Sequence, residues 1–455
     1  MRILFFAWRP DLRRFTGLVQ ALTADGHEVV IAAPKGRRGR KLPQAIAETE
    51  GVRVEKYREV ADPGFGDAIR LLRHTRDYAW YLLPEQAVAS YNRRRAADWL
   101  VRSATGGRRG AAQAWPDPLV SVEPETAGHL AGALAQLERR IPADPGVVRF
   151  VEEQDPDVVL VTPLVRHGSL QPEAVKAARE LGIPSGFLVH SWDNLSNKGL
   201  IHVAPDRVFV WNEVQRQEAS TLHGIDPEHV VVTGASHWDT FFQRSPSTSR
   251  EDFCRRHGFD PHHPAVLYLG STNDVCPDEP RLVEGWLEAV RSASGPLREA
   301  NVLIRRHPAE TARWERWTPR HERVSLSDNP KIGGQDLYDE LHHAALAVGL
   351  NTSAQIEASI VGTPVYTFSA GTLGPGQEGS LHFYYLLRDR GGVVTYARTL
   401  AEHVEQIEHG ISGEPDPEPI RRFCEFFVRP HGIERPVTPI LAAEIVQLAA
   451  LRGRV

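Results

Sequence analysis

The sequence lacks most of the features that would tie a protein to a membrane, a nucleic acid or a metal. Only three of its 455 residues are cysteines, and they show no metal-ligand spacing, which fits a reducing compartment and a structural role. The apolar opening Ile3–Trp8 is too short for a signal-peptide core or a membrane span. A net charge of −5 gives no general excess of base for nucleic-acid binding. We therefore predict a cytoplasmic protein without a metal site and without a nucleic-acid partner.

What the sequence does contain is typical of a folded globular chain. Hydrophobic residues make up 41% and charged residues 24% of the total, close to the usual globular balance. A chain of 455 residues is too long for one ordinary core, so two or three domains are expected.

Strands and helices alternate along both halves of the chain. In the first half, apolar runs such as "EVVIAAP" and "DVVLVTP" alternate with segments of helical spacing such as "PEAVKAARELG". The second half repeats the pattern, with "AVLYLG", "NVLIRRHP", "LAVGL" and "PVYTF" as strands. This alternation indicates parallel sheets covered by helices on both faces. The sequence therefore predicts an α/β protein of two Rossmann-like, doubly wound domains that face a cleft.

The composition between the two sets of strands indicates the domain boundary. After Gly234 the chain becomes rich in Ser, Pro and Arg, as linkers often are. We predict a first domain at residues 1–245, a second domain at 246–415, and C-terminal helices at 416–455 that pack back across the domains.

A long insertion, at about residues 57–149, interrupts the first domain. Its expected helices interleave arginines with aromatic residues, among them Arg73, Arg76, Arg95, Tyr78 and Tyr81. One interpretation is a solvated helical hairpin packed on the sheet edge. The other is an acceptor-docking or membrane-surface element, in which arginines meet phosphates and aromatic rings lie at headgroup level.

The segment "VGLNTSAQIE" carries the strongest signal for a binding site. A buried strand ends at Gly349, a turn presents Asn351, Thr352 and Ser353, and the following helix carries Glu357 in its first turn. A Ser/Thr cluster at this point can simply cap the helix. The same hydroxyls, with free N–H groups and the helix dipole, also suit an anion, and a glutamate can accept from ribose hydroxyls. Together these groups fit a nucleoside diphosphate.

Basic side chains end a neighbouring strand of the second domain. Arg305, Arg306 and His307 follow "NVLI", and Pro308 ends the strand. In a parallel sheet they would lie at the same rim as the Ser353 turn, where arginine can bind a phosphate and histidine can help a diphosphate to leave. The alternative is one arginine in water and one in a surface ion pair.

The first domain has a polar loop at the end of the strand "GFLVH". The sequence "HSWDNLSNKG" places His190, Asp193, Asn194 and Lys198 close together. Ligands of doubly wound sheets bind beyond the carboxyl ends of strands, so His190 is a candidate general base and Asp193 can orient it or replace it. Asn194 and Lys198 are candidate sugar or acceptor contacts. Alternatively, His190 donates to a loop carbonyl and the rest is turn chemistry.

A glycine-rich segment, "GTLGPGQEGSLHFYYL", follows the strand at Pro364–Phe368. Glycines of this density let a backbone approach a ligand closely, or merely make a flexible loop. Gln377, Glu378 and His382 are candidate contacts to sugar hydroxyls.

Taken together, these motifs resemble those of the GT-B superfamily of nucleotide-sugar-dependent glycosyltransferases. The two-domain layout, the strand-turn-helix with Ser353 and Glu357, and the opening "RRFTGLVQALTADGHEVVIAAP" carry the resemblance. A looser similarity is to the CDP-glycerol glycerophosphotransferase branch, which builds teichoic-acid and capsule polymers. That branch has a His-Gly-Thr-Pro-Leu-Lys strand end, for which "HSWDNLSNKG" can stand, as well as counterparts of "RRHP" and "NTSAQIE". Ser191 replaces the glycine of the first motif, and the loop before Lys198 is longer.

The resemblance implies a metal-independent glycosyltransferase that moves a sugar from a nucleotide-sugar donor on the second domain to a hydroxyl acceptor on the first. Such an enzyme would serve surface polysaccharide or glycolipid synthesis, with the nucleotide sugar as substrate and no cofactor. A lipid-linked glycan acceptor would hold it at the inner face of the membrane as a peripheral protein. The alternatives are a CDP-alcohol-dependent polyol-phosphate transferase, a non-catalytic nucleotide-sugar-binding protein, and a sugar-nucleotide epimerase, for which no paired-carboxylate motif stands out in the sequence.

Overall fold

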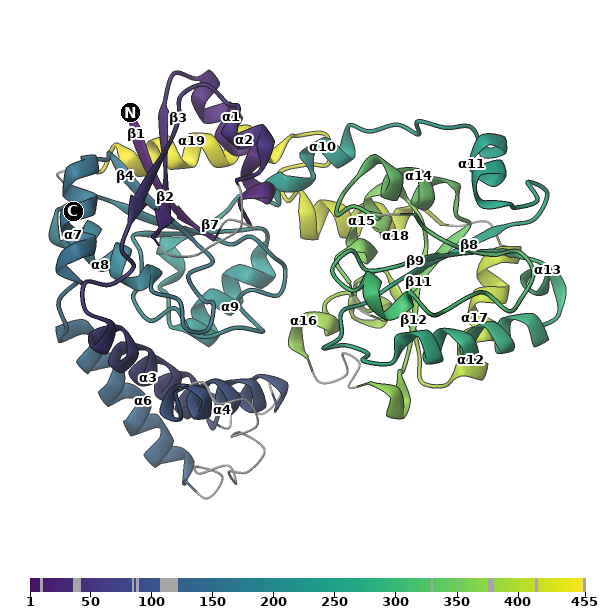
Figure 1. Cartoon of the computed structure of the whole chain (residues 1–455), viewed down its shortest axis with the longest axis horizontal. Coiled ribbons are helices and arrows are strands. Elements are labelled where there is room, and N and C mark those ends of the chain that lie inside the picture. Colours follow the sequence, from purple (N-terminus) through teal and green to yellow (C-terminus); the bar gives the residue numbers. More distant parts are fainter. Residues whose placement is uncertain are drawn as a thin grey trace. The chain divides into compact units, whose positions relative to one another are not determined.

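Two parallel β-sheets, each in its own structural unit, organise the chain in the computed structural model (Figure 1). Unit 1 comprises Met1–His237, Gly379–His382 and Phe427–Val455, and unit 2 comprises Trp238–Glu378 and Phe383–Phe426. The predicted boundary after residue 245 therefore falls inside unit 2, and the C-terminal segment is divided between the units. The structure describes residues 1–8, 11–35, 42–83, 86, 90–106, 122–328, 330–350, 352–374, 380–413 and 416–452.

The sheet of unit 1 has seven strands in the order β3-β2-β1-β4-β5-β6-β7, all parallel. Its central strands are buried along their whole length, as the continuous apolar runs predict. The strands are β1 (Arg2–Ala7), β2 (Glu28–Pro34), β3 (Val52–Tyr57), β4 (Val158–Thr162), β5 (Ser185–Leu188), β6 (Arg207–Val210) and β7 (Val230–Val232).

Helices cover both faces of this sheet, because side chains alternate along each strand. Leu4 and Phe6 of β1 point into one core with α7 (Pro145–Gln154) and α8 (Gln171–Glu180). Ile3 and Phe5 point into the other core with α1 (Thr16–Ala24) and the C-terminal helix α19 (Val437–Ala449). The last helix of the chain is thus part of the first unit (Figure 1). The remaining helices of the sheet region are α2 (Gln44–Ala47) and α9 (Glu213–His223).

The sheet of unit 2 has six parallel strands in the order β10-β9-β8-β11-β12-β13. They are β8 (Ala265–Leu269), β9 (Asn301–Arg305), β10 (Val324–Leu326), β11 (Leu346–Gly349), β12 (Val365–Phe368) and β13 (Val394–Ala397). The helices are α10 (Asp239–Phe242), α11 (Arg250–His257), α12 (Glu279–Ser292), α13 (Gly295–Arg298), α14 (Gln335–His343), α15 (Ala354–Val361), α16 (Leu381–Tyr384), α17 (Leu400–Ser412) and α18 (Glu418–Phe423). Helix α16 straddles the boundary between the units, since Leu381 and His382 count with unit 1.

The strand orders locate where ligands would bind. In each sheet the first strand of the unit has its second strand on one side and its fourth strand on the other. The chain therefore reverses its direction of travel between β1 and β4, and again between β8 and β11. At such a switch point the loops beyond the carboxyl ends of the strands separate and leave a crevice for a ligand. The predicted doubly wound, Rossmann-like architecture is confirmed for both units.

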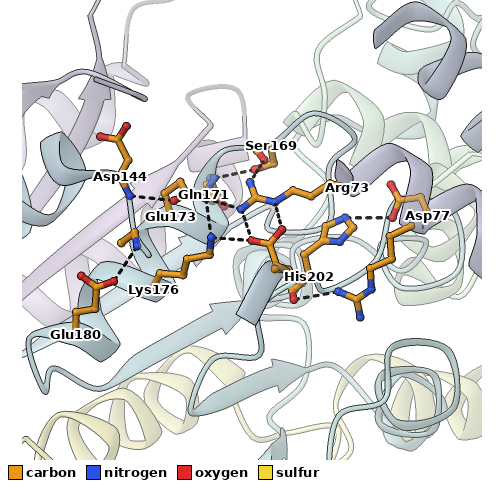
Figure 2. A network of polar contacts seen from close by, with 12 residues as sticks. Arg73, Asp77, Asp144, Ser169, Gln171, Glu173, Lys176, Glu180 and His202 are labelled. Atoms are coloured by element: carbon orange, nitrogen blue, oxygen red, sulfur yellow. Dashed lines mark hydrogen bonds and ion pairs between the residues drawn. The ribbon is translucent and has the colours of Figure 1, made fainter. Parts of the chain in front are cut away.

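The insertion of unit 1 consists of three described helices, α3 (Pro63–Trp80), α4 (Ser90–Ala104) and α6 (Pro124–Arg140), which pack with one another (Figure 1). The arginines of α3 do not all face solvent. Arg73 is buried and forms ion pairs with Glu138 of α6 and Glu173 of α8, while Arg76 donates to the carbonyl of His202. Figure 2 shows Arg73 and Glu173 within this network. The insertion is therefore tied into unit 1 by charged groups on its inner face.

Aromatic residues of the insertion also face inward. Tyr78 and Tyr81 are buried and pack with Ala96 of α4, and Trp80 lies against them. Trp99 stacks on the ring of His167 at a centroid distance of 5.8 Å. These rings form a small core of the insertion, so the interpretation in which they lie at the headgroup level does not apply to them.

Candidate functional site

In unit 2, the predicted donor residues follow parallel strands and lie at one edge of the sheet. Arg305 ends β9, Ser353 follows β11, and β8 lies between these strands and is parallel to both. Gly270, directly after β8, is in close contact with the end of β9: a Cβ there would lie 2.8 Å from the Arg305 carbonyl oxygen and from the backbone nitrogen of His307. The structure thus brings the two predicted motifs to the same switch point.

Arg305, the predicted phosphate ligand, already has carboxylate partners within unit 2. Its guanidinium is buried and lies 2.6 Å from Glu340 and 2.9 Å from Asp336, and it also donates to the Lys331 carbonyl. An arginine held by two carboxylates has no charge left to offer a phosphate, so we assign it to anchoring α14 on the sheet. The nearby His307 is half-buried, its Nδ1 accepts from the backbone of Ala309, and burial lowers its pKa.

The Ser353 turn is not a simple helix cap. Ser353 itself is in a helical conformation, and its side chain makes no capping hydrogen bond. Thr352 Oγ1 instead accepts from the backbone of Ala354 at 3.4 Å, and Gln355 donates to the Gly349 carbonyl. The Ser353 hydroxyl therefore stands at the amino end of α15 without a capping task in the described part of the chain.

Glu357 is buried one turn into α15, where its Oε1 accepts from the indole N–H of Trp238 at 3.4 Å. No motif predicts this partner, which lies far away along the chain. A carboxylate that already accepts one N–H retains lone pairs for a further donor such as a ribose hydroxyl.

A second acidic group at this edge escaped the sequence analysis. The carboxylate of Glu279 accepts from the backbone and hydroxyl of Ser271, in the loop after β8, and pairs with Arg313. Burial raises the pKa of Glu279 to about 7, against the opposing charge of Arg313. Ser271, the partner of Glu279, is the second residue past the end of β8. Its position next to the switch point is the signal that could have pointed to this site.

In unit 1, His190 lies at the carboxyl end of β5 beside a carboxylate that the sequence analysis did not name. Its Nε2 is 3.6 Å from Oδ1 of Asp11, and the two side chains are only 11% and 14% exposed. Arg14 donates to the backbone carbonyl of His190 at 2.7 Å. Asp11 follows β1, the strand at the switch point, which is the positional signal that could have revealed it.

The protonation states of these two groups follow from their burial. Burial, together with the charge of Arg14, lowers the pKa of His190 to about 3. Burial raises the pKa of Asp11 to about 6, although Arg14, Arg166 and Lys198 oppose the rise. At pH 7 the imidazole is therefore neutral and the Asp11 carboxylate is ionised. A neutral imidazole next to a carboxylate can accept a proton and have the resulting charge stabilised.

Asp193 does not orient His190. Its Oδ2 accepts from Lys198 Nζ at 2.9 Å and from the Asn197 amide at 3.1 Å. Burial would raise the pKa of Asp193, yet the charges of Lys198 and His382 hold it well below its usual range. Lys198 is accordingly paired with Asp193. Asn194 closes the loop instead, because its Oδ1 accepts from the backbone N–H of His190 at 3.1 Å.

His382 belongs to the same cluster. Its ring contacts the Trp192 ring edge-on, with the centroids 4.8 Å apart. Burial lowers the pKa of His382 to about 4, and Asp193, Lys198 and Arg95 add smaller electrostatic effects. The structure thus places the predicted residues His190, Asp193 and Lys198 near Asp11, and His382 near Asp193 and Lys198. Asn351, Gln377 and Glu378 lie outside the described residues.

The described residues hold neither a metal-binding cluster nor a helix that could span a membrane. They contain no group of three or more His, Cys, Asp or Glu side chains arranged to hold a metal ion. Among the same residues, no helix combines the length and the apolar character needed to cross a membrane. The three cysteines are buried.

Comparison with known proteins identifies the fold. No protein-family model and no curated protein matches the sequence, but solved structures match over nearly the whole chain. The UDP-GlcNAc 2-epimerase from Methanocaldococcus jannaschii matches with a TM-score of 0.52 and 12% identity, over 98% of this chain and 99% of that one. The Neisseria meningitidis enzyme bound to UDP-GlcNAc matches with a TM-score of 0.52 and 13% identity, over 98% and 100%.

A glycosyltransferase from Rickettsia africae ESF-5 matches with a TM-score of 0.56 and 11% identity, over 99% of this chain and 98% of that one. At such identities the likeness establishes the fold and not the reaction. Together with the strand orders it confirms that the chain has a GT-B-type fold of two Rossmann-like domains. The narrower similarity to the CDP-glycerol branch stays a prediction.

Proposed function

We propose that this chain is an enzyme that binds a nucleotide sugar and epimerises its sugar. The observation that carries the proposal is the end-to-end likeness to UDP-GlcNAc 2-epimerases, which spans 98% of this chain and 99% and 100% of the two cited enzymes. A likeness over both domains includes both sheet edges at which substrates of such folds bind. Epimerisation was an alternative in the sequence analysis, and it now replaces sugar transfer as the preferred reaction.

The polar cluster of unit 1 supports epimerisation. Inverting a carbon centre requires one group that takes up a proton and another that returns one. The sequence shows no paired-carboxylate motif because Asp11 and Asp193 come from distant segments. In the fold the charge of Asp193 is near enough to raise the pKa of Asp11, and His190 lies beside Asp11. We assign proton transfer to His190 and Asp11, with Asp193 as a further candidate.

The edge of unit 2 supports nucleotide binding. The amino end of α15 offers the positive end of the helix dipole and the hydroxyl of Ser353, which suit a diphosphate. Glu357 is the candidate for the ribose hydroxyls, and Thr352 and His307 are candidates for contacts to the phosphates. We withdraw Arg305 from this set because its charge is already compensated.

Sugar transfer to a hydroxyl acceptor is the second candidate reaction. The TM-score of 0.56 to the Rickettsia africae glycosyltransferase favours it. In that case His190 would take the proton from the acceptor hydroxyl, as the sequence analysis proposed. The same residues would act, so only the products distinguish the two reactions.

Proton and phosphorus NMR in D2O distinguishes the candidates. With UDP-GlcNAc and no acceptor, an epimerase yields a second sugar nucleotide with an intact diphosphate and deuterium at the inverted carbon. GDP- and CDP-linked donors test other bases. A glycosyltransferase leaves the donor intact until an acceptor is added and then releases nucleoside diphosphate. Consumption of a CDP-alcohol with release of CMP indicates a polyol-phosphate transferase.

Thermal shift provides the binding control for this assay. A nucleotide sugar at a hundred times its dissociation constant should stabilise the folded chain by about 2.7 kcal/mol. Stabilisation without conversion of any donor would indicate a non-catalytic binding protein. If no nucleotide or nucleotide sugar stabilises the chain or is converted, the proposed function is wrong.

Peripheral membrane binding, which the sequence analysis considered for the insertion, depends on the arginines that remain at its surface. Arg93, Arg94 and Arg102 of α4 are exposed, whereas Arg73 is buried in ion pairs. Each arginine near an anionic surface contributes about 1 kcal/mol at low salt. Replacing all three by glutamine is therefore expected to weaken sedimentation with phosphatidylserine vesicles about 100-fold.

Neutral phosphatidylcholine vesicles are the control for this experiment. Equal recovery of the wild-type protein with anionic and neutral vesicles at low salt would leave the helical insertion as a solvated packing element. That result would also remove the support for the hypothesis of a lipid-linked acceptor.

A further inference from the structure

The helical insertion reaches the polar loop, residues 190–199, through the backbone of the loop. The hydroxyl of Tyr81, at the end of α3, donates to the Lys198 carbonyl at 2.8 Å. The amide of Asn92, in α4, donates to the Ser196 carbonyl. Tyr81 and Asn92 are both buried. Because these donors bind carbonyl groups, they fix the path of the loop irrespective of its side chains.

Asp77 of α3 fixes the point where the polar loop ends. Its Oδ1 accepts from the backbone N–H of Leu200 at 2.8 Å and lies 3.2 Å from Nε2 of His202 (Figure 2). A Cβ at Gly199 would lie 2.7 Å from Asp77 Oδ2, so the loop can pass here only with a glycine. Burial would raise the pKa of Asp77, but His202 and His167 hold it far below its usual range, and the group stays ionised.

Arg95 of α4 extends this support to the cluster at His190. Its Nη1 donates to Oδ1 of Asn197 at 3.2 Å, and Nδ2 of Asn197 donates to Oδ2 of Asp193 at 3.1 Å. The same Asp193 oxygen accepts from Lys198 Nζ. The Arg95 contact determines which way the Asn197 amide faces, because an arginine can only donate and therefore selects the amide oxygen.

We propose that the insertion is the element that positions the polar loop, and that Arg95 is a positioning residue that acts on Asp193 through Asn197. The insertion would then be part of the catalytic apparatus of unit 1, in contrast to the docking role that its composition suggested. The kinetic consequence of this inference rests on the proposed function. The structural consequence, an ordered polar loop, is independent of the proposed function.

The test replaces Arg95 by methionine, which keeps the apolar stem and removes the donor. With the substrate found by the NMR assay, kcat is expected to fall about 10-fold or more while KM stays nearly constant, because misplacing a reacting group affects the transition state more than substrate binding. Arg95→Lys restores a donor and should recover part of the loss. Arg94→Met is the matched control, since Arg94 is the exposed neighbour on the same helix.

Amide hydrogen exchange of the unliganded protein tests the inference without catalysis. In Arg95→Met the amides of residues 191–199 should exchange about 10-fold faster than in the wild type, while the midpoint of thermal unfolding stays close to that of Arg94→Met. Tyr81→Phe, which removes only a hydroxyl, should have the same effect on the loop.

The two measurements separate this inference from the proposed function. If the wild type converts no nucleotide sugar but the loop exchanges faster in Arg95→Met, the proposed function fails and the positioning role stands. Unchanged exchange in both Arg95→Met and Tyr81→Phe overturns the positioning role. A drop in kcat that is matched by an equal loss of thermal stability, without recovery in Arg95→Lys, overturns it as well.

Discussion

Replacing Arg73 by methionine is expected to destabilise unit 1 by about 3–5 kcal/mol, because it leaves buried carboxylates without a counter-charge. Arg73 Nη2 lies 2.8 Å from Glu138 and also pairs with Glu173, and all three side chains are buried. Lys176 shares both carboxylates (Figure 2), but one lysine cannot neutralise two negative charges. Chemical denaturation of the wild type and the variant measures the difference in free energy of unfolding.

Arg70→Met is the matched control on the same helix. Arg70 pairs with Asp67, whose side chain is exposed, and exposed pairs contribute about 0–1 kcal/mol. Adding Glu138→Gln to Arg73→Met removes one of the uncompensated charges and should recover part of the lost stability. A loss for Arg73→Met no larger than that for Arg70→Met would show that the buried network does not hold the insertion to unit 1.

The same cluster predicts how acid affects unit 1. Burial alone would raise the pKa of Glu138, but Arg73 and Lys176 hold it at about 2, below the usual value of 4.5. A carboxylate whose pKa is lower in the folded state contributes stability above the unfolded pKa and loses it as the pH falls towards the folded one. This contribution is therefore complete above about pH 5 and fades towards pH 2. Arg73→Met should move the acid-unfolding midpoint to higher pH.

The fold could be predicted from the sequence wherever a strand is fully buried. Strand β2 coincides with the quoted run "EVVIAAP", and β4 and β8 lie inside theirs. The strands that escaped prediction, β3, β10 and β13, lie at the edges of the sheets and are only partly buried. An edge strand has a neighbour on one side only, so it can carry polar residues that interrupt the apolar run.

The insertion shows why its role could not be predicted. On α3 the charged residues Arg73 and Asp77 are buried, whereas Leu71 is 39% exposed. Helical periodicity locates an inner face by its apolar residues, so it fails where the inner face is charged. The partners that make burial of Arg73 possible, Glu138 and Glu173, are supplied by α6 and α8.

The candidate site could be predicted only in part, because some of its residues come from segments without a recognisable pattern. His190 and Asp193 follow a recognisable buried strand, and the switch-point rule places them at the ligand edge. Asp11 comes from a short 3-10 turn after β1 and becomes a partner of His190 only through the pairing of β1 with β4 and of β4 with β5. The ion pairs of Arg305 could not be predicted, because its partners in α14 carry no motif.

Replacing His190 by alanine is expected to reduce turnover by about 100-fold or more, because general acid–base groups contribute factors of this size. Nucleotide affinity should stay nearly constant, since the nucleotide is assigned to unit 2 and His190 belongs to unit 1. Steady-state kinetics give the change in kcat, and thermal shift with the nucleoside diphosphate gives the affinity. Asp193→Asn is measured in parallel, and the larger loss of kcat identifies the proton-transfer group.

The partnership with Asp11 gives this prediction a pH signature. Asp11 has a pKa of about 6, so its carboxylate is available to stabilise a protonated His190 above pH 6 and is lost as the pH falls below it. In the wild type kcat/KM should therefore decline below about pH 6, and in Asp11→Asn this limb should disappear together with most of the activity. Asn keeps the shape of the side chain, and circular dichroism checks that the variant is folded. If folded His190→Ala keeps near-normal turnover and Asp11→Asn keeps the acidic limb, His190 is a structural residue at the end of β5, and proton transfer has to be assigned to Asp193 or His382.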